Sequence, residues 1–201
     1  ETAGFPGTTA KQAGRLFREL DLEVVASHTP LPLGDQRQQV LDTLSEIGSP
    51  CAITSTAPAW MASTTAIRHA CDRLNQAAAV CADNGFEFAL HNHYWEYAPV
   101  PGDGRLGSDM LLELLDPRIG FEIDTYWVKT AGLDPAGVVR DMGSRAWLLH
   151  IKDGPATRED PMMAIGEGVM DFESILQAGR GCTRWALVEL DRCATDMLDA
   201  V

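Results

Sequence analysis

The sequence predicts an α/β fold, a (β/α)8 TIM barrel in which parallel strands alternate with helices. Short apolar runs each end in a side chain that can bind a metal or move a proton, at His91, Asp124, His150 and Glu189. Such runs are typical of strands buried on both faces, and these barrels carry their chemistry at the carboxyl ends of the strands. The expected strand ends recur at intervals of roughly 30 residues, enough for a strand plus a crossover helix. No glycine-rich dinucleotide fingerprint follows a strand, which argues against an open doubly wound sheet.

The first half of the chain is expected to alternate helices and strands. Apolar side chains recur at helical spacing in three segments, and a threonine at position 8 or 9 can cap the first of them. Gly48 stands where it can end the second helix. Helices are therefore expected over residues 10–20, 35–47 and 64–84. Strands are expected over residues 22–28, 50–54 and 86–91.

The second half continues the same alternation. Ser108 and Asp109 are expected to cap a helix, and Pro135 occupies a first helical position, where proline is tolerated. Helices are expected over residues 110–115, 135–142 and 172–178, with residues 193–201 as the start of another. Strands are expected over residues 120–124, 147–150 and 185–189, with a long loop over residues 154–168. No linker or shift in composition divides the series, so residues 1–201 are expected to form one domain.

The bulk composition narrows the classes of partner and compartment. Hydrophobic residues make up 45% and charged residues 22%, as in ordinary soluble proteins, and no apolar run is long enough to cross a bilayer. A net charge of −13 disfavours nucleic acids and anionic membranes as partners. The chain shows no secretory leader, and its five cysteines have no metal-knuckle or redox spacing. A cytoplasmic protein with reduced thiols is expected, and a homo-oligomer is left open.

Asp124, His150 and Glu189 form a carboxylate, imidazole, carboxylate set at successive strand ends. Mixed oxygen and nitrogen ligands suit a divalent Mn, Mg, Co, Fe or Zn ion. Each residue also has an alternative role. Asp124 can cap the following turn, His150 can be a buried histidine with ordinary partners, and Glu189 can pair with Lys152 or Arg192.

The segment after the strand that ends at His91 offers further candidates. His91 and His93 are two residues apart, so both can point into the barrel while Asn92 points outward. With Glu96 just beyond, this set can supply a fourth ligand and a general base. For His93, a hydrogen bond to a ligand is the favoured reading.

Aromatic side chains flank the strand ends and can stack on sugar faces or simply pack. Trp60 and Trp127 are the candidates for substrate binding among them. The full set is Trp60, Tyr94, Trp95, Tyr97, Tyr126 and Trp127.

Several motifs along most of the chain resemble the xylose-isomerase-like barrels, which include sugar phosphate isomerase/epimerase proteins. The sequence Leu-His-Ile-Lys-Asp at residues 149–153 and the Glu-Ile-Asp that ends at Asp124 carry much of this likeness. His-Asn-His at residues 91–93 resembles a subgroup of that family. The other matching segments are residues 165–172, 188–191, 125–128, 131–135 and 94–97.

The resemblance implies that Asp124, His150 and Glu189 are metal ligands. Many relatives carry a glutamate where His91 stands, so the fourth ligand stays open between His91 and Glu96. It also implies that Glu1 ends the second strand of the barrel. A βα unit before Glu1 and a helix after Val201 are therefore expected in a longer natural chain, because an interrupted barrel leaves unpaired strand edges.

The function expected from this resemblance is that of a metal-dependent sugar or keto-sugar isomerase or epimerase, with a lyase or dehydratase as a variant. A base, Glu189 or His91, removes a proton next to a carbonyl, and Lys152 holds the developing negative oxygen. The substrate is contacted by His28, His93, Glu96, Trp60 and Trp127.

Two other functions are alternatives. An apurinic-site endonuclease needs a zinc cluster and a DNA-binding face, which a net charge of −13 disfavours. The second alternative is a non-catalytic barrel that only binds a ligand. The intact metal-ligand positions argue against it, because a binding module does not need them.

Overall fold

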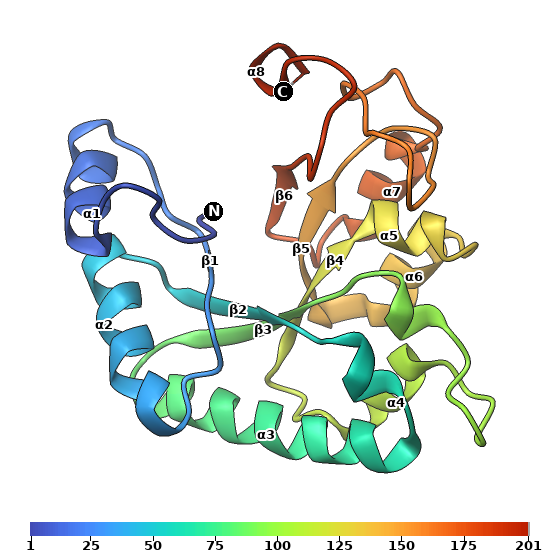
Figure 1. Ribbon diagram of the computed structural model, residues 1–201, viewed down its shortest axis with the longest axis horizontal. Coiled ribbons are helices and arrows are strands. Elements are labelled where there is room, and N and C mark those ends of the chain that lie inside the picture. The colour runs from blue at the N-terminus through green and yellow to red at the C-terminus, as the bar shows by residue number, and fades with distance from the viewer. Residues whose placement is uncertain (201) are drawn as a thin grey trace.

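The computed structural model describes residues 1–200, apart from the side chains of residues 198 and 199. Six parallel strands pair in chain order and curl into a half-barrel, which is part of a TIM barrel (Figure 1). The strands are β1 (Ser27–His28), β2 (Cys51–Ser55), β3 (Glu87–His91), β4 (Gly120–Asp124), β5 (Ala146–Ile151) and β6 (Trp185–Val188). The fold class predicted from the period of the sequence is thus confirmed.

Helices cover the outer face of the curved sheet, with α1 and α2 beside β1 and β2 (Figure 1). The longer helices are α1 (Ala10–Glu19), α2 (Arg37–Ile47), α3 (Thr64–Asp83), α4 (Gly107–Leu114), α6 (Pro135–Met142) and α7 (Phe172–Gly179). The short ones are α5 (Thr125–Thr130), α8 (Met197–Ala200), η1 (Gly34–Gln36), η2 (Pro58–Met61), η3 (Trp95–Tyr97) and η4 (Gly143–Arg145). None of the helices described in residues 1–200 is long and apolar enough to span a membrane.

The alternation of side chains along β4 shows how the fold separates its core from its chemistry. Phe121 and Ile123 pack in the main hydrophobic cluster between the sheet and the helices. Glu122 and Asp124 take the opposite direction, into the interior of the half-barrel, because successive strand residues face opposite sides. A smaller apolar cluster that includes Ile53 occupies the lower part of that interior. The ligand-type side chains of β4 therefore lie at the carboxyl end of the strand, beyond this apolar cluster.

The first strand is shorter than predicted. The expected strand over residues 22–28 is limited to Ser27–His28, because β2 begins at Cys51 and offers no partner to the residues further back. On the other side, the N–H of Thr2 donates to Ala26 over 3.2 Å and Thr2 accepts from the N–H of His28 over 2.8 Å. Thr2 and Ser27 form an isolated parallel bridge. The predicted stub near Glu1 therefore does pair as a strand would.

Two helix starts also differ from the prediction. Helix α4 begins at Gly107, so Ser108 and Asp109 lie inside its first turn rather than capping it. Helix α2 begins at Arg37, after the short η1 turn. Helix α5 was not predicted at all. It has only six residues and follows β4 directly, so it shows no helical period long enough to be noticed.

Candidate metal centre

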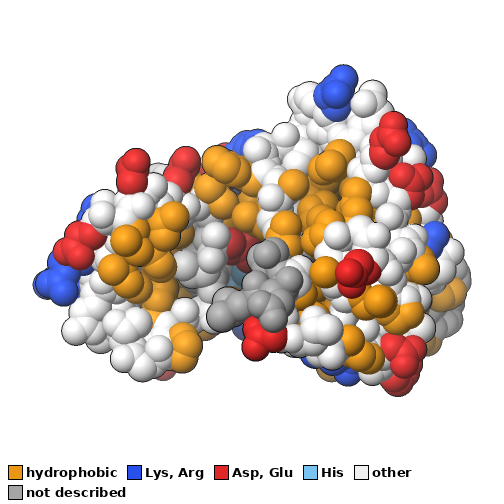
Figure 2. Space-filling model, turned by 90° about the horizontal axis from the view of Figure 1, so that it is seen from above, with side chains coloured by type: hydrophobic (Ala, Val, Ile, Leu, Met, Phe, Trp, Pro, Cys, Tyr) orange, Lys and Arg blue, Asp and Glu red, His pale blue; other side chains and the backbone are white. Residues whose placement is uncertain are grey.

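Side chains able to bind a metal converge at the carboxyl ends of the strands. Two groups have ligand atoms that all lie within 4.8 Å of one another, and His150 belongs to both. We call Asp124, His150 and Glu189 the Asp124 cluster. We call His28, His91, Glu122 and His150 the Glu122 cluster. Seen from above, acidic and histidine side chains show at the bottom of a hollow in the surface (Figure 2).

The Asp124 cluster has the geometry of an ion site. His150 Nδ1 lies 2.6 Å from Glu189 Oε2 and 3.9 Å from Asp124 Oδ2. Ligand bonds of about 2.0–2.2 Å allow two atoms that share an ion to be at most about 4.4 Å apart. All three atoms are buried, and none has a hydrogen bond of normal geometry among the described residues. Two carboxylate oxygens and one imidazole nitrogen placed in this way form a donor set that fits a divalent metal ion.

Asp124 is held in place through its other oxygen and its backbone. Asp124 Oδ1 accepts from the N–H of Trp127 over 2.9 Å and so caps α5. Asn92 donates to the Asp124 carbonyl over 3.2 Å and accepts from its N–H over 3.0 Å. Asn92 is therefore buried against the backbone of β4. The capping role weighed for Asp124 is real, and it leaves Oδ2 free to face the cluster.

Lys152 places a buried cation beside the same oxygens. Its Nζ lies 2.9 Å from Asp124 Oδ2, 2.7 Å from Glu189 Oε2 and 3.0 Å from Asp191 Oδ2. Burial alone would lower the pKa of Lys152, but these three carboxylates raise it above its usual value. Burial would raise the pKa of Glu189, but His150 and Lys152 hold it well below its usual range. Both groups are therefore charged at neutral pH.

Glu122 is the centre of the second cluster and was not predicted as a site residue. Its side chain is fully buried, with Oε2 at 3.0 Å from both His91 Nδ1 and His28 Nε2. Its Oε1 lies 3.2 Å from His150 Nε2. Burial would raise the pKa of Glu122, but contacts with the three histidines hold it well below its usual value. Glu122 could have been identified from its position two residues before Asp124, because this spacing places both side chains on one face of β4.

Glu1 completes the acidic surroundings of this cluster. Its carboxylate lies 2.7 Å from His28 Nε2 and 3.3 Å from His150 Nε2. Burial lowers the pKa of His28, but hydrogen bonds to Glu1 and Glu122 more than offset this and raise it to about 9. His28, predicted to bind substrate, therefore lies among the ligand-type groups. A cavity of about 180 Å³ opens beside them, lined in part by Glu1, His150 and Glu189.

His91 and Glu96, the two candidates for the fourth ligand, have different surroundings. His91 Nε2 lies 3.9 Å from Asp124 Oδ2, although His91 belongs to the Glu122 cluster and not to the Asp124 cluster. Glu96 belongs to neither cluster among the described residues. It accepts hydrogen bonds from the Thr56 hydroxyl and from the N–H of His93, the latter over 2.9 Å. His91 thus has one nitrogen near Asp124 and stays a candidate for the fourth ligand, whereas the contacts of Glu96 lend no support to such a role.

Burial raises the pKa of Glu96 to about 7, although its hydrogen bonds act in the opposite direction. The folded state then binds the proton more tightly than the unfolded chain, so this contribution to stability is present below pH 4.5 and is lost as pH rises through 7. We expect the free energy of unfolding of the wild type to fall, relative to Glu96→Gln, by up to about 3 kcal/mol between pH 4.5 and 8.

Urea denaturation across this pH range, in the presence of EDTA, measures the effect. The exposed Glu46 supplies a matched control as Glu46→Gln. Parallel stability curves for the wild type and Glu96→Gln would contradict the raised pKa.

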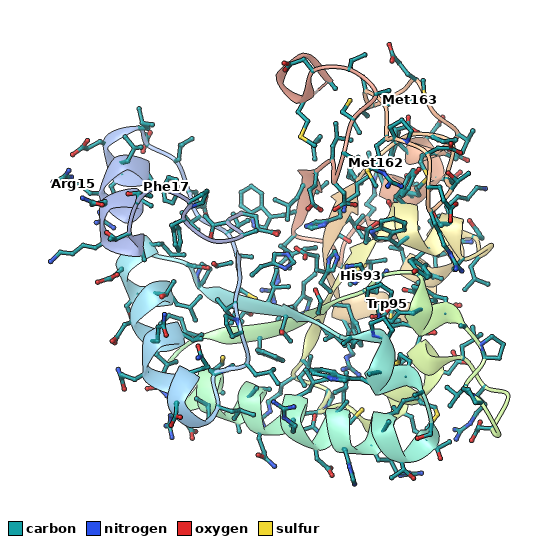
Figure 3. The ribbon with its side chains drawn as sticks, in the orientation of Figure 1. Arg15, Phe17, His93, Trp95, Met162 and Met163 are labelled. Carbon is teal, nitrogen blue, oxygen red and sulfur yellow. The ribbon has the colours of Figure 1, made fainter. Side chains whose placement is uncertain are left out.

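The rings of three residues lie beside the clusters, and we call them the aromatic wall: His93, Trp95 and Trp127. The His93 ring stacks on Trp95 at 4.1 Å, and its centroid lies 6.4 Å from that of Trp127 (Figure 3). Burial lowers the pKa of His93 to about 4, and the neighbouring His91 acts in the same direction, so His93 is neutral. The Arg158 guanidinium lies over the Tyr94 ring at 4.0 Å. This wall presents flat, largely uncharged surfaces toward the strand ends.

Trp60 does not belong to this wall. It packs against the main core cluster, with the Arg73 guanidinium 5.8 Å from its ring. No ring contact joins it to His93 or Trp127 in the described part of the chain. The structure therefore brings together His93 and Trp127 but not Trp60.

The comparisons with known proteins agree with this architecture. The family model for the Xylose isomerase-like TIM barrel matches residues 4–190. A crystal structure of a sugar phosphate isomerase/epimerase from Parabacteroides distasonis is similar with a TM-score of 0.81 at 21% identity, covering 96% of this chain and 79% of that one. An AP endonuclease of family 2 from Brucella melitensis gives a TM-score of 0.71 at 12% identity, covering 98% and 83%.

A structure of the IolI protein with a binding zinc atom is also similar, with a TM-score of 0.68 at 13% identity over 92% of this chain and 74% of that one. No curated protein matches the sequence. At these identities the structural likenesses show the fold alone, and none distinguishes the expected His-Asn-His subgroup. The family model, by contrast, spans most of the sequence and all six strands, so the chain belongs to the xylose isomerase-like TIM barrel family.

Proposed function

We propose that the protein is a metal-dependent isomerase or epimerase of a sugar or keto-sugar, which acts by removing a proton next to a carbonyl. The observation that carries the proposal is the convergence of Asp124 Oδ2, His150 Nδ1 and Glu189 Oε2, buried ligand-type atoms that all lie within 4.8 Å of one another. These three residues, with His91 as the fourth, would hold the ion. A divalent ion there would act as a Lewis acid toward the carbonyl and its neighbouring hydroxyl.

The residues of the chain supply the remaining parts of such a reaction. The Lys152 ammonium, fixed by three carboxylates, can stabilise the negative oxygen that develops as the proton leaves. Glu189 is ionised at neutral pH and can accept a proton, although its lowered pKa makes it a weak base. His91 is the alternative base. The wall of His93, Trp95 and Trp127 offers a stacking surface for a sugar ring.

The substrate class rests on the same chemistry. A small neutral sugar is compatible with the strongly acidic chain, whereas the phosphates of DNA or of a membrane surface are repelled by a net charge of −13. The similar sugar phosphate isomerase/epimerase structure supports a carbohydrate ligand. No feature of the site favours DNA cleavage over this reaction.

Metal analysis of the purified protein, followed by a substrate panel in deuterated water, tests the proposal. Ketoses, inososes and 3-keto-glycosides are the classes to screen, with exchange of a carbon-bound proton for deuterium as the signal. We expect one class to exchange in a metal-dependent manner and EDTA to abolish the exchange. A protein that binds no divalent ion would refute the proposal.

We expect His91→Ala to weaken metal binding by at least about 10–100-fold, because loss of an outer hydrogen-bond partner of a ligand alone typically costs that much. Glu96→Ala should leave metal binding close to that of the wild type, because Glu96 faces Thr56 and the His93 backbone instead. Titration calorimetry with Zn²⁺ measures both. His69→Ala, on the exposed side of α3, is the control histidine variant. If Glu96→Ala loses the metal and His91→Ala keeps it, the ligand assignment must be reversed.

A further inference from the structure

Glu122 is the one fully buried carboxylate of the two clusters that the proposed reaction does not use. We propose that Glu122 is a positioning residue that holds His91 and, together with Glu1, His150, so that the N–H groups of both rings are directed at these acids and their other ring nitrogens face Asp124 as free lone pairs. This inference rests on the proposed metal site. It assigns to Glu122 the orientation of His91 and a share in that of His150.

For His91 the two ring nitrogens face different acids. Nδ1 is hydrogen-bonded to Glu122 Oε2 over 3.0 Å, while Nε2 lies 3.9 Å from Asp124 Oδ2. A neutral imidazole carries one proton, on one nitrogen only. A proton on Nδ1 is therefore held by Glu122, and the lone pair on Nε2 is directed to the Asp124 cluster.

For His150 the same division holds with the nitrogens exchanged. Nε2 lies 3.2 Å from Glu122 Oε1 and 3.3 Å from Glu1 Oε2. Nδ1 lies 2.6 Å from Glu189 Oε2 and makes no hydrogen bond of normal geometry. The hydrogen bond of Nε2 goes to Glu1, with Glu122 Oε1 beside it, so the N–H on Nε2 points at this pair of acids. Nδ1 then presents its lone pair to Asp124 and Glu189.

The two oxygens of Glu122 face different histidines. Oε2 faces His91 and also His28, whereas Oε1 faces His150 and is buried without a hydrogen bond of normal geometry. Carboxylates that receive the second N–H of a histidine ligand fix its ring and increase its basicity toward the metal. Glu122 is suited to this role because it lies one inward position before Asp124 on β4.

The competing reading is a second ion within the Glu122 cluster. Such an ion would use the nitrogens of His91 and His150 that face Glu122. Each ring would then bridge two ions and would have to lose its one remaining N–H proton, which neutral imidazole does not readily do. The geometry therefore favours one ion in the Asp124 cluster and an orienting role for Glu122.

Zinc binding and imidazole ¹⁵N NMR of the wild type and Glu122→Gln test the inference. In the zinc-loaded wild type we expect one Zn²⁺ per chain, the N–H of His91 on Nδ1 and that of His150 on Nε2. In Glu122→Gln we expect a 10–100-fold weaker zinc affinity at the same stoichiometry, since removal of such a partner typically costs about that much. Glu87→Gln, an acid at the opposite end of β3, is the control.

The outcomes separate the two proposals. A wild type that binds no zinc refutes the proposed function, and this inference with it. Two zinc ions in the wild type and one in Glu122→Gln would make Glu122 a ligand of a second ion and overturn the inference alone. An unchanged zinc affinity in Glu122→Gln would also overturn the inference. So would NMR spectra of the zinc-loaded wild type that place the N–H of His91 on Nε2 or that of His150 on Nδ1, and this test does not require the variant to fold.

Discussion

Asp124→Asn is expected to lower the zinc affinity by at least about 100-fold, because loss of an outer hydrogen-bond partner alone costs up to about that much. The substitution changes little in shape and can keep the oxygen that caps α5 through Trp127. It replaces Oδ2, the atom that faces His150 and Lys152, with an amide that cannot ligate as a carboxylate does. Proton exchange with the substrate should fall to background. Titration calorimetry and the deuterium assay measure the two effects.

Two further variants separate metal binding from the cap. Asp124→Ala should lose the ion and also about 1 kcal/mol of stability, because a helix cap is typically worth that much. Asp134→Ala removes a comparable cap, the one that accepts from the N–H groups of Ala136 and Gly137 at the start of α6. It should lower stability by a similar amount and leave zinc binding intact. Asp124→Asn protein with wild-type zinc affinity would show that the cluster is not the metal site.

The barrel and the strand-end residues were predictable because they follow from periods in the sequence. Repeated apolar runs fixed the parallel series, and polar residues at the ends of those runs pointed to Asp124, His150 and Glu189. The structure brings these three together at the carboxyl edge of the sheet. Their convergence follows from parallel pairing in register, in which His150 aligns with Asp124 on the neighbouring strand.

What the sequence could not show depends on the path of the chain after each strand. Beyond His93 the η3 turn directs Glu96 back toward Thr56, and no periodic signal encodes that reversal. The sequence does not mark Glu122 as a site residue, because it lies within a strand between two apolar residues. A charged side chain at such a position looks like a break in the apolar pattern of a core strand. Its contacts are with three histidines from other strands, which only the curvature of the sheet brings within 3.2 Å.

Asp153→Ala is expected to have the largest effect on stability. The Asp153 carboxylate is fully buried after β5 and accepts hydrogen bonds from four backbone N–H groups. Three of them belong to the following loop, with distances of 2.8, 3.0 and 3.2 Å from Gly166, Gly168 and Met170. The fourth is that of Gly154, at 2.8 Å. One side chain therefore holds the loop of residues 154–171 against the sheet.

The loss follows from the donors that remain. Each buried N–H left without a partner costs about 1–3 kcal/mol, so Asp153→Ala should lower the free energy of unfolding by roughly 3–5 kcal/mol if part of the loop regains water. Gly168 lies so close to Asp153 that a Cβ at this position would collide with the Asp153 carboxylate and the Gly154 nitrogen. The loop therefore packs tightly on this side chain. Amide hydrogen exchange should rise at residues 166–170, and urea denaturation gives the change in stability.

Asp171→Ala is the matched control for this prediction. Asp171 is also an acid that accepts from a backbone N–H, that of Ser174 at the start of α7, but it is exposed and should cost only about 1 kcal/mol. Asp153→Asn keeps the size of the side chain yet turns one acceptor into a donor, so its stability should fall between those of the wild type and Asp153→Ala. Equal losses for Asp153→Ala and Asp171→Ala, with unchanged exchange at residues 166–170, would show that the loop is held by its other contacts. Because Lys152 precedes Asp153 on the same strand end, an opened loop should also weaken the hold of Lys152 on Asp191, and proton exchange would then fall along with stability.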